Sequence, residues 1–309
     1  MPSQSQSSFI GIELSGSKLS GAVVNSEGTI MKRAEAAVNG GGLVAQVATI
    51  VTELSAGEAN VGGVGIAIPG LVNRQSDRVI ASSFLPSTVG NNLHAELMKA
   101  TGLRVELEND ANAAAYGEYL VGAGRGSRDM FYITIGEGIG GAIILDGKLW
   151  TGSSGFAGEV GHITIDTEGA ECLCGNRGCL ETVASAPNIV RRANERLNRD
   201  STSSLSRLAL NKDFTADDMA REATEGDDFA LMMLERTGKY IGQRHQPAEH
   251  RTHRAWRWGY AGTRAHFESG DTGSQAPCLS TVLRSHRDSG SLTWTRRRHH
   301  RRCNARPRR

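Results

Sequence analysis

The sequence lacks an apolar run long enough to span a bilayer, and its first eight residues are polar and uncharged, with no apolar signal region. We therefore expect a cytoplasmic protein with no membrane partner. Cysteine is also scarce, at five residues in 309. In a reduced compartment, clustered cysteines bind metal more often than they form disulfides.

The last 66 residues contain no lysine, isoleucine or methionine. From residue 244 onward 15 arginines stand against four acidic residues, a net charge of +11, whereas the first 243 residues carry a net charge of −9. This segment has no apolar periodicity and little from which to build a core. One interpretation is an arginine-rich arm for nucleic acid. We favour the other, a change of reading frame near Gly242, and so expect 244–309 to be a disordered Arg/His-rich tail that does not bind nucleic acid.

Metal ligands and carboxylates gather between residues 158 and 181. One histidine and three cysteines match the ligand set of a structural Zn²⁺ site: His162, Cys172, Cys174 and Cys179. Four such ligands leave no open position for a catalytic water, so we expect the flanking Glu159 and Glu181 to face a polyol. Gly175 and Gly178 allow the tight reversals that the spacing needs. The alternative is that the cysteines are buried or redox-active.

Apolar periodicity predicts an α/β protein with two related halves that face each other across a cleft. We expect an N-terminal domain over 1–108 and a C-terminal domain over 109–243, because the strand–turn–strand pattern of residues 10–24 returns at 131–145. The predicted strands are 9–14, 19–24, one near Thr29, 64–68, 105–107, 131–135 and 141–145, and the predicted helices are 43–54, 113–121 and 231–243.

Two turns rich in glycine and small hydroxyl residues, 15–18 and 134–141, join pairs of predicted strands. Their backbone N–H groups could surround phosphate oxygens, so together they indicate one nucleotide held between the halves. Tight hairpins prefer the same residues, which leaves a purely structural interpretation open for each loop. Lys18 either reaches phosphate or is a solvated strand residue.

Asp110 lies at the start of a predicted helix, inside the run Glu108–Asn109–Asp110–Ala111–Asn112. It could cap that helix, although Asn109 alone could do so. It could instead accept the proton of an alcohol during phosphoryl transfer, with Asn109 holding neighbouring hydroxyls. The residues themselves leave both possibilities open.

From Phe9 to Gln243, the order of these motifs resembles the ROK family of bacterial sugar kinases and sugar-responsive repressors. The resemblance implies a duplicated ribonuclease-H-like, actin/hexokinase-like fold, with Asp110 as catalytic base. It implies sugar ligands at Gly70, Asn109, Glu159, His162 and Glu181, with His162 also a zinc ligand beside Cys172, Cys174 and Cys179. The implied cofactors are ATP, Mg²⁺ and structural Zn²⁺, with ATP phosphates at Ser15, Gly16, Ser17, Lys18, Thr134, Gly136, Gly138 and Gly140.

The resemblance implies transfer of the γ-phosphoryl group of ATP to a hexose. The favoured substrate is glucose, which would become glucose 6-phosphate, and the alternative substrate is an N-acetylhexosamine. Alternatives are a catalytically silent sugar-binding protein and a transcription regulator; the regulator is disfavoured because about eight residues precede the first strand, too few for a helix-turn-helix. A homo-oligomer, dimer or tetramer, is also implied.

Several residues depart from the family pattern. Ser15 replaces a glycine, Glu137 replaces a common threonine, and Phe84 stands where the family has asparagine before Leu-Pro. The family's C-terminal Gly-Gly-Gly turn is absent after residue 243, so we expect incomplete folding and weak activity.

Overall fold

The computed structural model describes residues 7–39, 42–197, 202–211 and 213–243, and the backbone of four strands at 254–260, 265–271, 279–285 and 292–298. The chain divides into two compact units. The first runs to Arg125 and includes Gly140–Glu159; the second takes Gly126–Ile139 and the chain from Val160 onward. This division differs from the boundary that we expected after residue 108, because the helix that begins at Asp110 contacts strands of the first unit.

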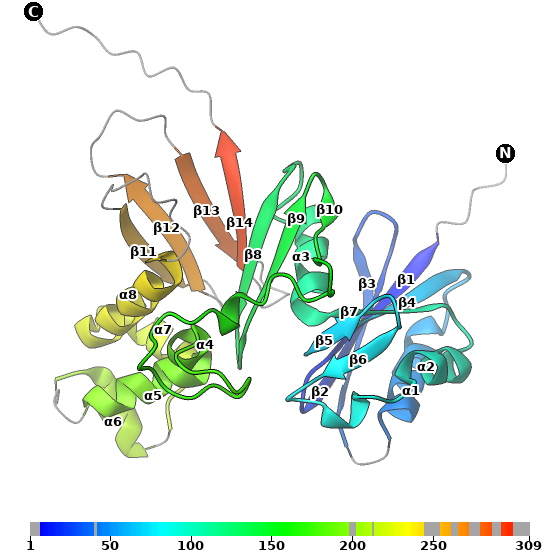
Figure 1. The fold of residues 1–309 in the computed structure, drawn as a ribbon, viewed down its shortest axis with the longest axis horizontal. Helices are drawn as coiled ribbons and strands as arrows, with labels where there is room; N and C mark the ends of the chain where they lie inside the picture. Colours follow the sequence, from blue (N-terminus) through cyan, green and yellow to red (C-terminus); the bar gives the residue numbers. More distant parts are fainter. Residues whose placement is uncertain are drawn as a thin grey trace, which may run out of the picture. The chain divides into compact units, whose positions relative to one another are not determined.

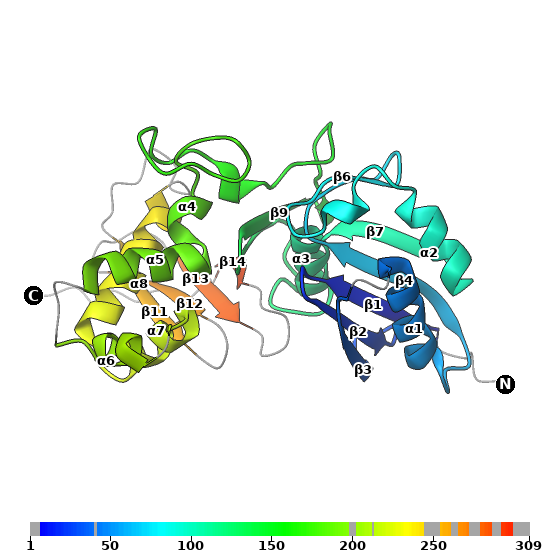
Figure 2. The same ribbon diagram turned by 90° about the horizontal axis from the view of Figure 1, so that it is seen from below.

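A five-stranded sheet with the order β3-β2-β1-β4-β7 forms the centre of the first unit. Strands β1 to β3 are antiparallel, whereas β4 is parallel to β1 and β7 is parallel to β4. Helices α1 (Leu43–Ser55) and α2 (Leu93–Thr101) lie on one face of this sheet (Figure 2). The strands are β1 (Ser8–Leu14), β2 (Lys18–Val24), β3 (Ile30–Ala37), β4 (Val61–Ile68) and β7 (Val105–Asn109).

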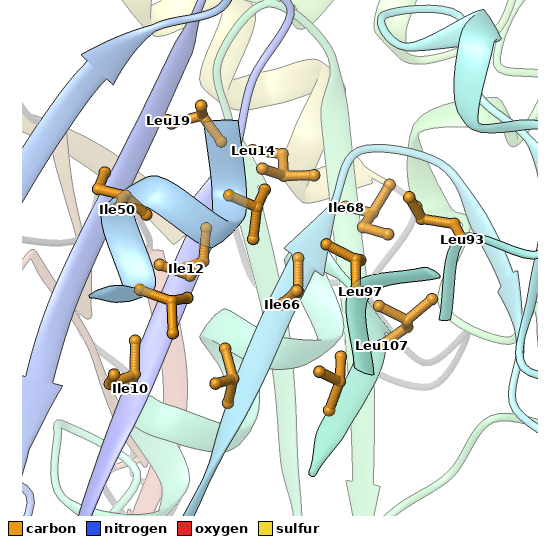
Figure 3. Close-up of a cluster of buried hydrophobic side chains, with 14 of the residues drawn as sticks. Ile10, Ile12, Leu14, Leu19, Ile50, Ile66, Ile68, Leu93, Leu97 and Leu107 are labelled. Carbon is orange, nitrogen blue, oxygen red and sulfur yellow. The ribbon is translucent and has the colours of Figure 1, made fainter. Parts of the chain in front are cut away.

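Alternating side chains of these strands build the core of the first unit (Figure 3). Ile10, Ile12 and Leu14 of β1 are at most 2% exposed, and they belong to one cluster with Ile50 of α1 and Leu97 of α2. The predicted strand 9–14 and the helix 43–54, which the helical spacing of its apolar residues predicts, are both confirmed.

The carboxyl ends of β1, β4 and β7 meet at one edge of the sheet. Glu13 lies opposite Ala67, Ala67 lies opposite Glu108, and Ile68 lies opposite Asn109. Ligands of α/β sheets bind beyond this edge. The fold therefore brings the ends of three strands that are distant in sequence to one place.

The remaining elements of the first unit are short or peripheral. In the hairpin of β9 and β10, Asp146 and Gly147 both have positive φ, as a two-residue type I′ turn requires. Sequence periodicity missed α2 and the β5–β6 hairpin. The elements are β5 (Leu71–Asn73), β6 (Arg78–Ala81), a 3₁₀ turn (Pro86–Thr88), α3 (Asp110–Leu120), β9 (Ile139–Leu145) and β10 (Lys148–Leu149).

Helices α5 to α8 lie together in the second unit (Figure 1). The core of this unit includes Ile189, Phe214 and Met233. Thr215 and Asp218 form a reciprocal capping box at the start of α7. None of the described helices is long and apolar enough to cross a membrane. The elements are β8 (Met130–Ile135), a 3₁₀ turn (Val160–His162), α4 (Glu181–Ala184), α5 (Ala186–Leu197), α6 (Ser204–Asn211), α7 (Ala216–Thr224) and α8 (Asp228–Gln243).

Within the tail that we expected to be disordered, the structure describes four antiparallel strands. They are β11 (Arg254–Tyr260), β12 (Ala265–Asp271), β13 (Leu279–Ser285) and β14 (Leu292–Arg298), and β14 pairs with β8 through Thr293 and Tyr132. Backbone ladders need no apolar periodicity, and these segments contain Trp, Tyr, Thr and Val, which favour strands. The rest of 244–309 lies outside the described residues, and the change of reading frame stays a hypothesis.

Candidate functional site

Asn109, not Asp110, caps helix α3. The Oδ1 atom of Asn109 accepts a hydrogen bond from the Asn112 N–H at 2.9 Å. Asp110 occupies the first helical position, where its Oδ1 accepts from the Ala111 N–H at 2.9 Å. The carboxylate of Asp110 is therefore relieved of the capping role that the sequence left open.

Asn109 also connects Asp110 to the loop after β4. Its Nδ2 donates to the Gly70 carbonyl at 2.9 Å and to Asp110 Oδ1 at 3.0 Å. Both side-chain N–H groups are thus used within the protein, so a hydroxyl ligand could reach Asn109 only as a donor to Oδ1. Asn109 is in the first place a residue that positions Asp110.

The backbone conformation at position 70 requires a glycine. Its φ is 144°, and an added Cβ would lie 2.2 Å from the Ala81 carbonyl oxygen. The hydroxyl of Ser82 donates to the Pro69 carbonyl and accepts from the Leu85 N–H. These contacts hold the Gly70 loop against the loop that carries Phe84.

Replacing Gly70 by alanine is expected to lower the free energy of unfolding by about 2–4 kcal/mol, because both the positive φ and the clash with a backbone oxygen must be relieved. Gly65→Ala is the matched control, since an added Cβ there meets nothing within 4 Å. Urea unfolding of both variants measures the difference. Equal stability of the two variants would contradict the assignment of strain to Gly70.

Asp110 lies in a setting that disfavours its charge. Burial raises the pKa of its carboxyl to about 6; the Ala111 N–H opposes this, and the negative charges of Glu13 and Glu159 add to it. The first unit therefore brings three acidic side chains near one another, two of which sequence analysis selected. A carboxylate with a pKa near the working pH is suited to accept a proton.

The predicted zinc ligands converge within the second unit. The donor atoms of His162, Cys172, Cys174 and Cys179 all lie within 4.8 Å of one another. The Sγ atoms of Cys174 and Cys179 are 3.7 Å apart, and Cys172 Sγ is 3.6 Å from His162 Nδ1. Zn–S bonds of about 2.3 Å in tetrahedral geometry separate two sulfurs by about 3.8 Å. The cluster therefore has the size of a tetrahedral zinc site.

The loop holds these thiols in an arrangement that suits a cation. Burial raises the pKa of Cys179 to about 12 and also raises that of Cys172, whereas the Asn176 N–H lowers that of Cys174. Buried thiols of this kind stay protonated at neutral pH unless a metal ion takes the proton's place. Gly178, with φ 66°, supplies the tight reversal, since an added Cβ would lie 1.4 Å from the Asp166 carbonyl oxygen.

The first glycine-rich loop is a hairpin closed by Ser15. Ser15 Oγ accepts from the Lys18 N–H at 2.9 Å, and the turn does not need the positive φ that a glycine would allow. The Lys18 ammonium is 2.7 Å from the Glu35 carboxylate, and both side chains are largely exposed. Lys18 is thus placed as a solvated strand residue. Gly16 lies close to the Phe84 backbone: a Cβ added at Gly16 would lie 3.6 Å from the Phe84 carbonyl oxygen.

The second glycine-rich loop is shorter than predicted. Thr134 lies in β8 and Gly140 in β9, so only residues 136–138 form the turn. The Gly136 N–H donates to the Gly138 carbonyl at 2.9 Å. Glu181 accepts from the Ile139 N–H at 2.8 Å, a contact that sequence reasoning missed. The glycine at position 138 was the sequence signal for this contact. A larger residue would not leave room for Glu181, because a Cβ added at Gly138 would lie 2.6 Å from Glu181 Oε2.

The two units thus hold different parts of the predicted site. The first contains Gly70, Asn109, Asp110, Glu159 and the loop 15–18; the second contains Glu181, the turn 136–138 and the four zinc-ligand candidates.

Comparison with known proteins identifies the family. The model of the ROK family matches residues 9–248. The glucokinase of Thermotoga maritima is 38% identical over 233 residues, which are 74% of this chain and 73% of that protein. A ROK family glucokinase from Streptomyces griseus, solved with glucose and AMPPNP, is 33% identical with a TM-score of 0.67, covering 76% of this chain and 77% of that one.

A ROK family transcriptional regulator, a homologue of the E. coli MLC protein, is also similar, with a TM-score of 0.66 at 31% identity over 76% of this chain and 60% of that one. These neighbours have the actin/hexokinase-like fold, which confirms the predicted α/β fold class. The chain therefore belongs to the ROK family.

Proposed function

We propose that this protein is an ATP-dependent hexose kinase that phosphorylates glucose at the 6-hydroxyl. The observation that carries the proposal is Asp110, a carboxylate relieved of helix capping by Asn109 and with its pKa raised to about 6. The Thermotoga maritima glucokinase, at 38% identity, and the Streptomyces griseus glucokinase with glucose and AMPPNP support this substrate pair.

In the proposed reaction, Asp110 accepts the proton of the sugar hydroxyl as the phosphoryl group is transferred. Asn109 fixes the orientation of the Asp110 carboxylate through its hydrogen bond to Asp110 Oδ1. Mg²⁺, when bound with ATP, neutralises charge on the phosphates. Glu13 offers a carboxylate oxygen of the kind that Mg²⁺ prefers, and its charge already acts on Asp110.

The sugar is held, in this proposal, by the Gly70 backbone and by Asn109, Glu159, His162 and Glu181. The cluster of His162 with the three cysteines fits a structural Zn²⁺. Because Nδ1 of His162 faces the Cys172 thiol, the ring orientation is set, and Nε2 is the nitrogen that would contact a sugar. ATP phosphates would contact the N–H groups of the two glycine-rich turns. A cytoplasmic location and a dimer or tetramer stay predictions of the family resemblance.

The pH dependence of kcat/KM is expected to show an acidic limb near pH 6. A base must be deprotonated, so activity falls as the pH drops through the raised pKa of Asp110. Glu13→Gln should move this limb to lower pH, because the Glu13 charge contributes to the raised pKa. Glu106→Gln, an exposed strand carboxylate beside Arg104, is the control. A limb that Glu13→Gln leaves in place would contradict the assignment.

The substrate is tested by ADP release from Mg²⁺-ATP with glucose, mannose, N-acetylglucosamine and N-acetylmannosamine. We expect turnover with glucose to exceed that with the N-acetylhexosamines. A similar structure from Listeria monocytogenes is described as an N-acetylmannosamine kinase, but at 24% identity the likeness shows a shared fold and does not favour that sugar. Sugar binding without any ADP release, from zinc-loaded protein, would indicate the silent sugar-binding alternative.

A further inference from the structure

The second glycine-rich turn is attached to the segment that follows the zinc-ligand candidates. The Ile139 N–H donates to Glu181 Oε2 at 2.8 Å, and the Ala186 N–H donates to the Gly136 carbonyl at 2.9 Å. Glu181 comes two residues after Cys179 in the sequence. Both ends of the turn are therefore anchored to the chain that leaves the cysteine cluster.

The segment before His162 contacts the same turn from another side. Gly161 packs closely against the Ile139 backbone, since a Cβ added at Gly161 would lie 2.2 Å from the Ile139 carbonyl oxygen. The Ile139 side chain is 3% exposed and belongs to one core cluster with Val160 and Leu180. The N–H, the carbonyl and the side chain of Ile139 thus all face segments that carry zinc-ligand candidates.

We infer that Glu181 is a positioning residue for the nucleotide: it fixes the turn 136–138, so that metal loading of the neighbouring His162/Cys172/Cys174/Cys179 cluster tightens nucleotide binding. The inference rests on the proposed kinase function. A metal ion that holds Cys179 also holds the start of α4 (Glu181–Ala184), because Leu180 between them is buried. The carboxylate of Glu181 then meets the Ile139 N–H at a fixed position, as a charge-assisted hydrogen bond.

Two variants separate this role from a plain sugar contact. Glu181→Ala removes the acceptor for the Ile139 N–H, whereas Glu181→Gln keeps an acceptor oxygen and removes the charge. Glu171→Gln is the matched control in the same loop, because Glu171 is mostly exposed and pairs with Arg177. Zinc content is measured for each variant, so that only loaded proteins are compared.

Hydrogen exchange of the Ile139 amide and calorimetric binding of AMPPNP without sugar are the readouts. We expect Glu181→Ala to speed Ile139 exchange and to weaken AMPPNP binding, each by about tenfold, as the loss of one such hydrogen bond implies. Glu181→Gln should restore most of both effects, and chelator-treated wild-type protein should resemble Glu181→Ala.

Ile139 exchange that is unchanged in Glu181→Ala or after chelation would overturn the inference. Faster exchange with unaltered AMPPNP affinity would also overturn it, since the turn would then not serve the nucleotide. If loaded wild-type protein binds no AMPPNP, the proposed kinase function fails, and the exchange data still decide whether the metal cluster and the turn are coupled.

Discussion

Replacing Asp110 by asparagine is expected to lower kcat by about a thousandfold while making the folded protein more stable at pH 8. The loss of activity follows because an amide cannot accept the hydroxyl proton, and general base catalysis supplies about 10²- to 10⁴-fold. The Asn109 and Ala111 contacts need only small adjustment, because an asparagine side chain still offers an oxygen acceptor. ADP release with saturating glucose measures the first effect.

The gain in stability has a definite sign. The pKa of Asp110 is about 6 in the folded protein against an ordinary value of 3.8, so stability falls as the pH rises from about 4 to about 6 and the full penalty applies above that range. Below about pH 4 both states are protonated and the effect vanishes. A shift of this size corresponds to at most about 3 kcal/mol at pH 8, which asparagine would recover.

Asp146→Asn is the matched control for Asp110→Asn, because Asp146 lies in an exposed hairpin turn with φ 50°, a conformation that asparagine also adopts. We expect it to change neither kcat nor stability. Urea unfolding at pH 4 and pH 8 measures the second effect. If Asp110→Asn retained near wild-type kcat, Asp110 would not be the base; if it lost stability at pH 8, the effect assigned to burial would be wrong.

Replacing Cys179 by alanine is expected to reduce bound zinc from about one ion per chain to none and to destabilise the second unit by about 4 kcal/mol or more. Cys179 is fully buried and its Sγ lies 3.7 Å from that of Cys174. Three remaining ligands leave the site open and the loop without its closing contact.

Leu173→Ala is the control in the same loop, because the Leu173 side chain is 86% exposed between two ligand candidates. It should retain its zinc and its stability. Metal analysis of the purified proteins and thermal unfolding with and without chelator provide the measurements. A Cys179→Ala protein with full zinc content would exclude the four-residue site.

Much of the site could be predicted because its parts are close in sequence. The zinc-ligand candidates lie within 18 residues, His162 to Cys179, so their spacing already constrained them to one loop. Helix α1 and strand β1 were predicted because burial follows their own periodicity. The β5–β6 hairpin and α2 were missed, since short elements depend on what they pack against.

The composition of residues 244–309 predicts no strands, but strands can form there through pairing of the backbone alone. Residues 254–298 contain four described strands although no apolar pattern predicts them, because inter-strand hydrogen bonds involve groups that every residue except proline carries. The two compact units also divide the chain differently from the boundary expected after residue 108. A helix belongs to the unit against which it packs, and α3 contacts β4 and β7.

The sequence by itself determined the family, the position of Asp110 at a helix start and the four zinc-ligand candidates, because each depends on residues near one another along the chain. Only the tertiary structure showed that Asn109, which caps α3 through the Asn112 N–H, also donates to the Gly70 carbonyl, 39 residues away. It likewise joined Glu181 to Ile139 across 42 residues. Such contacts arise from the meeting of strand ends and helix starts in the folded chain, and local residue patterns do not encode them.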